Sequence, residues 1–155
     1  MSYKPIGCRD AHARIDELLV GNSIAGFECG DVWALRLSDP DRSISFHSLG
    51  SSSLPSIEEV VRANAWNTLP PSDASLVAWS ILLTTAMRRR ITATSLDETA
   101  TLLVNFEGGL HLSILTDTPI VDWQWSIASD SRNPYESVAD IACFRPSEIV
   151  VRETG

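Results

Sequence analysis

The sequence predicts an α+β fold, with antiparallel sheets that come from two helix-plus-β-meander segments and pack on a central apolar helix. Two observations lead to this prediction. Apolar and polar residues alternate in two separate runs of short strands, as in antiparallel strands with one buried face. Each run follows a segment whose apolar residues have helical spacing. The chain has 155 residues, an ordinary size for one domain, and we expect residues 1–155 to form a single domain.

The first helix and meander are expected between Asp10 and Phe46. Asp10 can cap a helix whose apolar residues keep helical spacing as far as Val20, and Gly21 is a suitable stop. From Ile24 onward, apolar residues alternate with polar or small ones, and an Asp-Pro-Asp turn comes before the last strand. This pattern is typical of three antiparallel strands joined by short turns.

Two more helices are expected before the second meander. Ser56 and Glu59 have the spacing of a capping box, which predicts a short helix over about Ile57–Ala65. The next helix opens at a Pro-Pro pair and is apolar nearly all round, so we expect it in the core. Three arginines (88–90) follow this helix, where cations complement the helix dipole. A phosphate-binding patch is the alternative interpretation of this run.

The second meander begins at Ile91. Its apolar residues alternate on both sides of the pair Gly108-Gly109, which predicts a hairpin turn with positive φ. A further alternating strand is expected over residues 121–127, with Trp123 and Trp125 facing inward, and a last strand over 148–152.

The two meanders are similar enough to be interpreted as internal repeats, over about residues 17–48 and 80–127. Each copy is an apolar helix followed by a β-meander. The period of about 65–70 residues is too long for a solenoid, and two copies are too few. We therefore expect two similar halves that superpose in the fold.

The charge balance restricts the partners. The chain has 20 acidic and 12 basic residues, for a formal net charge of -8. This argues against nucleic acid and against an anionic membrane surface as partners. It leaves open a basic protein partner, whose encounter an acidic surface accelerates. Eight of the acids follow residue 100, against three arginines, so we expect the last third to supply most of the negative field. The alternative is that the charge only maintains solubility.

The N-terminal residues lack an apolar signal segment, and the longest apolar stretch, Leu76–Met87, is too short to span a bilayer. We therefore expect a cytoplasmic protein. The three cysteines, Cys8, Cys29 and Cys143, are odd in number and contain no CxxC pair. They predict neither a disulfide framework nor a zinc site, and Cys29 and Cys143 are expected as buried thiols.

No arrangement of residues points to catalysis. The common nucleophile, phosphate-loop and metalloprotease motifs are absent from the sequence. His47 and His111 fall at matching places in the two meanders, which repetition explains better than a site. Adjacent carboxylates, as at Asp97-Glu98, do not face one another on a helix or a strand. We expect no enzymatic activity, no catalytic residue, no cofactor and no metal.

The candidate partner-binding residues are chosen by charge and expected exposure. They are Asp97, Glu98, Glu107, Asp117, Asp122, Trp66 and Tyr135. Asp97, Glu98 and Asp117 fall in expected turns of the second meander and could form one acidic edge. Trp66 and Tyr135 lie in loops outside any periodic face, and aromatic anchors with a charged rim are typical of protein interfaces. For Trp66, covering a helix end is the alternative.

Several motifs follow one another in a fixed order along about residues 17–127. The residues that carry them are Leu19, Gly21, Ile24, Trp33, Leu35, Leu37, Ile44, Phe46, His47, Leu102, Val104, Phe106, Gly108, Gly109, Leu110, Leu112, Ile114, Trp123, Trp125 and Ile127. This order resembles small bacterial immunity-type proteins of contact-dependent inhibition and other polymorphic toxin systems. The resemblance leaves the last 28 residues uncovered and carries over no individual binding residue. It implies a non-enzymatic cytosolic inhibitor that binds a cognate toxin protein, such as a basic nuclease, and blocks it.

Two other function classes stay open. One is a small-molecule-binding or enzymatic domain without a coded motif, which a deep polar pocket with shifted carboxylates or histidines would favour. The other is a homodimer that pairs through a free strand edge, which a concentration-dependent size in solution would favour.

Overall fold

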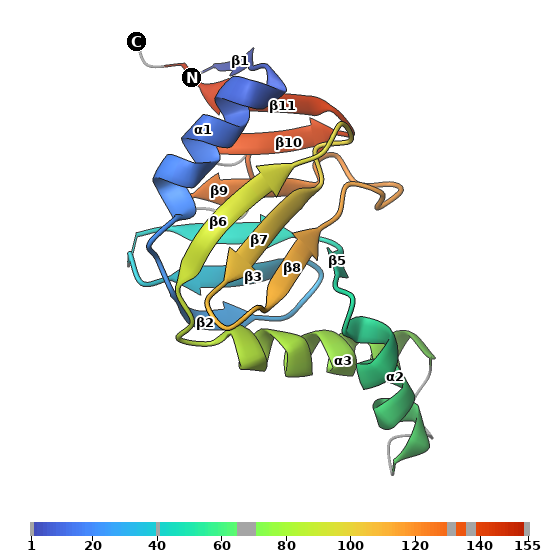
Figure 1. Cartoon of the computed structure of the whole chain (residues 1–155). Helices are drawn as coiled ribbons and strands as arrows, with labels where there is room; N and C mark the ends of the chain where they lie inside the picture. The colour runs from blue at the N-terminus through green and yellow to red at the C-terminus, as the bar shows by residue number, and fades with distance from the viewer. Residues whose placement is uncertain (1, 40, 65–70, 130–132, 136–138, 154–155) are drawn as a thin grey trace.

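Two antiparallel sheets packed face to face make up most of the molecule. The computed structural model describes residues 2–39, 41–64, 71–129, 133–135 and 139–153, and not the side chains of residues 71–73. Within these residues the chain forms a seven-stranded sheet, a four-stranded sheet and three helices (Figure 1). The α+β class with antiparallel sheets is thus confirmed.

The larger sheet has the strand order β1-β11-β10-β9-β4-β3-β2. Its strands are β1 (Tyr3–Pro5), β2 (Ile24–Glu28), β3 (Trp33–Leu37), β4 (Ser43–Phe46), β9 (Trp125–Ala128), β10 (Ile141–Arg145) and β11 (Glu148–Arg152). Strands β2 to β4 are the first meander that the alternation predicts, and β11 is the expected last strand. Strands β1 and β10 are additions that the sequence pattern did not predict.

The smaller sheet has the order β5-β8-β7-β6. Its strands are β5 (Leu49–Gly50), β6 (Ile91–Leu96), β7 (Leu102–Phe106) and β8 (His111–Ile114). The Gly-Gly hairpin turn between β7 and β8 has φ of 85° and 83°, as predicted. Strand β9 is shorter than expected, because it begins at Trp125 and Trp123 lies in the preceding loop, buried against His47.

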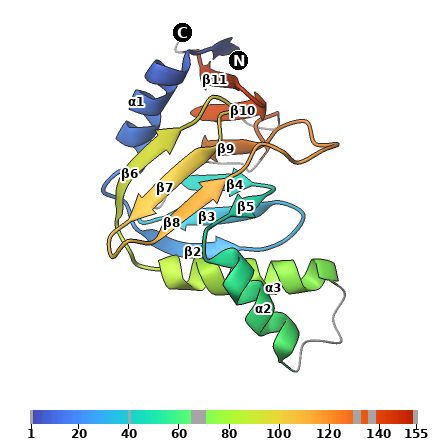
Figure 2. The same ribbon diagram turned by 45° about the vertical axis from the view of Figure 1, so that its right-hand side comes forward.

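Helices close the sandwich at its sides and one end. Helix α1 (Cys8–Leu19) lies beside β6 and covers β10 and β11, where the larger sheet extends past the smaller one (Figure 1). Helices α2 (Leu54–Ala63) and α3 (Pro71–Ala86) form a hairpin at the other end (Figure 2). Helix α2 starts earlier than expected: Ser53 is its N-cap, so Ser56 lies inside the helix and no capping box forms.

The sheets pack on each other, not on a central helix. Helix α3 lies at one end of the sandwich (Figures 1 and 2). It buries Ala78, Leu82 and Leu83, while Leu76 and Ile81 remain 43% and 39% exposed. An apolar pattern all round the helix therefore does not place it in the centre. One face contacts the sandwich and α2, and uncharged residues occupy the open face.

Trp125 is the largest fully buried side chain of the core. Its indole Nε1 donates a hydrogen bond of 2.9 Å to the carbonyl oxygen of Ala100, in the turn between β6 and β7. A buried indole N–H needs such an acceptor. Because Trp125 lies on the larger sheet and Ala100 on the smaller, this bond fixes the β6–β7 turn against the opposite sheet.

The outer face of the larger sheet is covered over much of its area, although Arg36 on β3 is exposed. Ala34, Ser45 and Ser126 on this face are at most 3% exposed. The Tyr3 hydroxyl donates to the Pro134 carbonyl at 2.7 Å and accepts from the Ala139 amide at 2.8 Å. Part of the connection between β9 and β10 therefore lies on this face, and Ala139 packs there with Ala128, Ala142 and Val150.

All three cysteines are free thiols, and Cys29 is exposed, contrary to expectation. It follows the last residue of β2 and lies in the turn before β3. Cys143 is buried as expected, and burial together with the nearby charge of Glu148 raises the pKa of its thiol to about 12. In the described part of the chain, no helix combines the length and apolar character that crossing a membrane requires.

Candidate protein-binding surface

Several of the predicted binding residues meet at one end of the sandwich, where β11 begins. Three connections lie there: the β6–β7 turn, the loop of residues 115–124, and the β10–β11 turn (Figure 1). The carbonyl of Thr99 accepts from the Ser147 amide at 3.1 Å and from the Thr116 hydroxyl at 2.8 Å. We call this region the acidic end and define it by Asp97, Glu98, Asp117, Asp122, Glu148, Ile120 and Tyr135.

Asp97 has a structural role in the β6–β7 turn. Its Oδ1 accepts hydrogen bonds from the Thr99 amide at 2.9 Å, the Thr99 hydroxyl at 2.7 Å and the Thr101 amide at 2.9 Å. These bonds, led by the one from the Thr99 hydroxyl, hold the pKa of the Asp97 carboxyl below its ordinary value. Asp97 is therefore ionised at neutral pH and sits on a rigid turn.

Two hollows flank the β10–β11 turn. The first has a volume of about 310 Å³ and is lined by Thr99, Thr101, Leu115, Thr116, Asp117 and Pro146. The second has a volume of about 420 Å³ and is lined by Val121, Asp122, Tyr135, Phe144, Arg145, Glu148 and Val150. Asp117 and Asp122 thus border neighbouring hollows on the two sides of one turn, so a single partner could contact both.

Tyr135 lies in a loop with 63% of its surface exposed. Its ring packs edge-on against Phe144 with 4.9 Å between the centroids, and its hydroxyl donates to the Asp122 carbonyl at 3.4 Å. The side chain is thus held in place while one face stays open, which suits an interface anchor. Trp66, the other aromatic candidate, lies outside the described residues.

Ile120 is a site residue that the sequence pattern missed. It is fully exposed and has a φ of 66°, which a β-branched residue rarely adopts. The strand expected over residues 121–127 placed it at a strand margin. The signal that could have found it is an apolar residue between Asp117 and Asp122, directly after Pro119.

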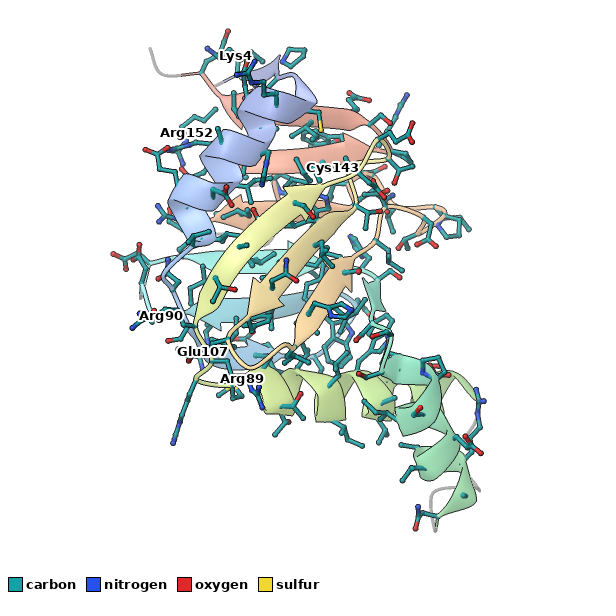
Figure 3. The ribbon with its side chains drawn as sticks, in the orientation of Figure 1. Lys4, Arg89, Arg90, Glu107, Cys143 and Arg152 are labelled. Carbon is teal, nitrogen blue, oxygen red and sulfur yellow. The ribbon has the colours of Figure 1, made fainter. Side chains whose placement is uncertain are left out.

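Glu107 does not belong to the acidic end. It lies in the β7–β8 turn, and consecutive turns of a meander fall at opposite ends of the sheet. Its Oε1 accepts from the Arg90 amide at 3.1 Å, and its carbonyl accepts from Arg89 Nη1 at 3.3 Å (Figure 3). Arg89 Nε also donates to the Thr85 carbonyl at 2.8 Å, at the end of α3. These contacts support the capping interpretation for Arg89.

The three histidines have separate partners. His12 Nε2 lies 2.6 Å from the Thr94 carbonyl, and His111 Nε2 lies 3.2 Å from the Ser52 hydroxyl. His47 packs on Trp123, and burial lowers its pKa. The strand pairing gives His47 and His111 different positions in their strands, so the match expected between them is wrong: His111 pairs with Asn105 near the start of β8, and His47 follows the end of β4.

The described residues contain no group of three or more His, Cys, Asp or Glu side chains that could hold a metal ion. The acidic end instead combines several carboxylates, of which Asp97 is held by three hydrogen bonds, with an exposed tyrosine and an exposed isoleucine. No family model matches the chain, and neither a curated protein nor a solved structure is significantly similar to it. The interpretation of this surface therefore rests on its own residues.

Proposed function

We propose that this chain is an immunity-type protein that binds and neutralises a basic, nuclease-like bacterial toxin domain through its acidic end. In this proposal it is not an enzyme, acts in the cytoplasm, and contacts neither nucleic acid nor membrane. The observation that carries the proposal is the fully exposed Ile120 between Asp117 and Asp122. An apolar anchor with a carboxylate rim is what a binding hot spot against a cationic surface requires.

Hydrogen bonds from the buried side chain of Gln124 hold the loop that presents Ile120. Gln124 is 4% exposed, its Oε1 accepts from the Thr118 amide at 3.2 Å, and its Nε2 donates to the Thr118 carbonyl at 3.1 Å. The backbone N–H of Gln124 also donates to the Cys143 carbonyl at 2.7 Å. A braced loop loses little conformational entropy on binding, which favours tight association. The positive φ of Ile120 is a local strain that the bracing sustains.

The carboxylates give the acidic end a negative charge that attracts a cationic partner. Asp117 and Asp122 line the two hollows beside the β10–β11 turn, and Glu148 and Arg145 share the hollow of Asp122. Asp97 and Glu98 lie on the β6–β7 turn, where the Glu98 carbonyl accepts from the Ser147 hydroxyl. Such a surface steers a cationic partner and accelerates association by roughly 10–10³-fold at low salt. We expect the toxin to use the same basic surface for this chain and for the phosphates of its substrate. Binding of this chain would therefore prevent substrate binding.

We also propose that the two helix-plus-meander segments are internal repeats. The register shift in the first strand pair of each meander falls after Ile24 and after Ile91, 67 residues apart. The second residue past each preceding helix has a positive φ: 92° at Gly21 and 64° at Arg88, again 67 residues apart. The Gly21 amide donates to the Ile91 carbonyl and the Arg88 amide to the Ile24 carbonyl, each at 2.9 Å. Reciprocal bonds of equal length are what an approximate internal twofold predicts.

The test is binding to the product of the neighbouring gene, which this proposal expects to be a nuclease-type toxin domain, expressed in an inactive form. We expect a 1:1 complex whose association rate falls steeply with salt. Replacing Ile120→Ser should raise the dissociation rate about tenfold or more. The matched control is Val60→Ser on α2, an exposed apolar residue away from the acidic end, which should leave binding unchanged.

A second pair of variants tests the charges. Asp117→Asn with Asp122→Asn should slow association several-fold at low salt. Glu58→Gln with Glu59→Gln on α2 changes the net charge equally and should have a much smaller effect. Equal effects of both pairs, or an association rate insensitive to salt, would contradict a role for the acidic end. Full binding by Ile120→Ser would contradict the role of the anchor.

A further inference from the structure

We propose that a cavity between α1 and the edge of the larger sheet binds a small ligand with a phosphate or carboxylate group. The cavity has a volume of about 530 Å³ and is lined by Lys4, Ile6, Arg14, Asp140, Val151 and Arg152. Small-molecule sites commonly start at about 300 Å³ and combine apolar walls with a few polar groups. The cavity lies where β11 ends, whereas the acidic end lies where β11 begins, so this site is independent of the proposed function.

Three cations reach the cavity from three different elements. Lys4 comes from β1, Arg14 from α1 and Arg152 from the end of β11. The ring of Tyr3 packs on Phe144, on the outer face of the sheet. Because successive strand residues point to opposite faces, Lys4 lies on the side of α1, next to its register partner Val151. Arg152 is the register partner of Tyr3 and lines the cavity from the end of β11. Figure 3 shows Lys4 and Arg152 at the same end of the molecule.

One carboxylate on the lining serves two guanidinium groups. Asp140 Oδ1 lies 3.8 Å from Arg152 Nη2, and Asp140 Oδ2 lies 3.6 Å from Arg42 Nε. The Asp140 side chain is only 16% exposed, yet the buried Arg42 Nε makes no hydrogen bond. Asp140 thus lies near two cations at distances longer than a hydrogen bond, and Arg42 also pairs with Asp39 at 3.0 Å.

The other two cations of the lining, Arg14 and Lys4, form no ion pair with Asp140. Arg14 pairs at 2.8 Å with Glu17, whose side chain is 69% exposed, and such an exposed pair is weak. Lys4 has no ion pair or side-chain hydrogen bond among the described residues. The lining therefore carries three positive charges and one negative charge, in a chain whose net charge is -8. An oxyanion in the cavity would offset this local excess with charge-assisted hydrogen bonds.

The remaining lining residues restrict the ligand. Ile6 and Val151 form an apolar wall, and Asp140 repels a second anionic group on its side of the cavity. The ligand should therefore carry its charge at one end and an apolar part or a hydroxyl donor at the other. A phosphate monoester and a carboxylic acid share this chemistry, and the experiment separates the two.

Lys4 is the only lysine in the chain, which makes the test selective. Reductive ¹³C-methylation labels its amine and keeps the positive charge. The methyl signal of Lys4 is then followed by NMR during titration with inorganic phosphate, with acetate and with sodium chloride at matched ionic strength. We expect a saturable shift with phosphate or acetate and only a small, linear shift with chloride. Saturation by phosphate alone identifies a phosphate site, and saturation by acetate alone a carboxylate site.

The variants Arg152→Gln and Arg14→Gln should each raise the half-saturating concentration about tenfold, because each removes a charge-assisted bond. Arg62→Gln on α2, which removes a cation paired with Glu58, is the control and should leave it unchanged. Arg14 is the safer of the two test variants, since within the described residues its ion pair is the exposed one with Glu17. A linear shift with every salt, or an unchanged midpoint in Arg14→Gln, would overturn the proposal.

Discussion

The two meanders have the same connectivity but opposite surroundings. The outer face of strands β3 and β4 is covered at Ala34 and Ser45, which are 3% and 1% exposed, whereas Arg36 on the same face is exposed. Strands β6 to β8 show their outer face to solvent, and their outward residues Leu103 and Ser113 are partly exposed. Alternation in the sequence therefore identifies the inner face, while the size of the outward residues reflects what covers the outer face.

The largest effect expected from this difference is an overpacking penalty in the first meander. Ser45 pairs with Ala34, and Ser113 pairs with Leu103, so the two serines hold equivalent places. Replacing Ser45→Leu should reduce the free energy of unfolding by about 2 kcal/mol, because the added atoms meet a covered face. Ser113→Leu should change it by less than about 0.5 kcal/mol, because its face is open. Urea unfolding followed by tryptophan fluorescence measures both.

Equal destabilisation by the two variants would contradict the difference in coverage. A large effect of Ser113→Leu alone would mean that the four-stranded sheet is the covered one. Ser45→Ala serves as a reference, because it removes the hydroxyl without adding volume.

Coverage also explains which strands the sequence could predict. The strands of both meanders were predictable because inward apolar residues alternate with outward residues that are mostly small or polar. Strand β10 was not, since Ile141, Ala142 and Cys143 are all buried and give no alternation. A strand with two buried faces reads as a short apolar run, which cannot be told from part of a helix.

The sequence could identify which candidate residues lie in turns, but not which of these turns lie at the same end of the sandwich. Asp97 and Asp117 follow local turn signals and do lie at the acidic end. Glu107 was assigned to the same surface, although the next turn of a meander must lie at the opposite end. Ile120 was missed because no periodic pattern marks an exposed apolar residue in a loop.

Substitutions at the connection between each helix and its meander are expected to change the free energy of unfolding by less than Ser45→Leu does. Gly21 and Arg88 both have positive φ, but only glycine adopts this conformation without steric cost. Replacing Arg88→Gly should raise the free energy of unfolding by up to about 1 kcal/mol, after allowance for the flexibility of glycine in the unfolded chain. Gly21→Ala should lower it by about 1 kcal/mol.

Arg88→Ala is the control for this pair. It removes the arginine side chain but keeps the Cβ, so it should bring no gain in stability. If Arg88→Ala stabilised as much as Arg88→Gly, the cause would be the lost charge and not the backbone. Thermal unfolding of the variants at one protein concentration decides between the two.

The smallest change in the free energy of unfolding is expected in the β6–β7 turn. The Thr99 hydroxyl is the main cause of the lowered pKa of Asp97, so Thr99→Ala should move that pKa up toward its ordinary value. A lowered pKa stabilises the fold above the unfolded pKa, and this stability is lost as the pH falls through the folded pKa. Thr99→Ala should therefore destabilise at neutral pH by less than about 0.5 kcal/mol, since the carboxylate is exposed. The part of this loss that arises from the charge should disappear once the pH falls below the folded pKa of Asp97.

NMR titration of the Asp97 carboxyl carbon measures the pKa directly. Thr92→Ala on β6, whose hydroxyl donates to the Asn105 carbonyl, is the control and should leave the pKa of Asp97 unchanged. A pKa of Asp97 that does not move in Thr99→Ala would mean that the backbone amides of Thr99 and Thr101 alone hold the charge. The acidic end would then owe the fixed position of the Asp97 carboxylate to the backbone shape of the turn.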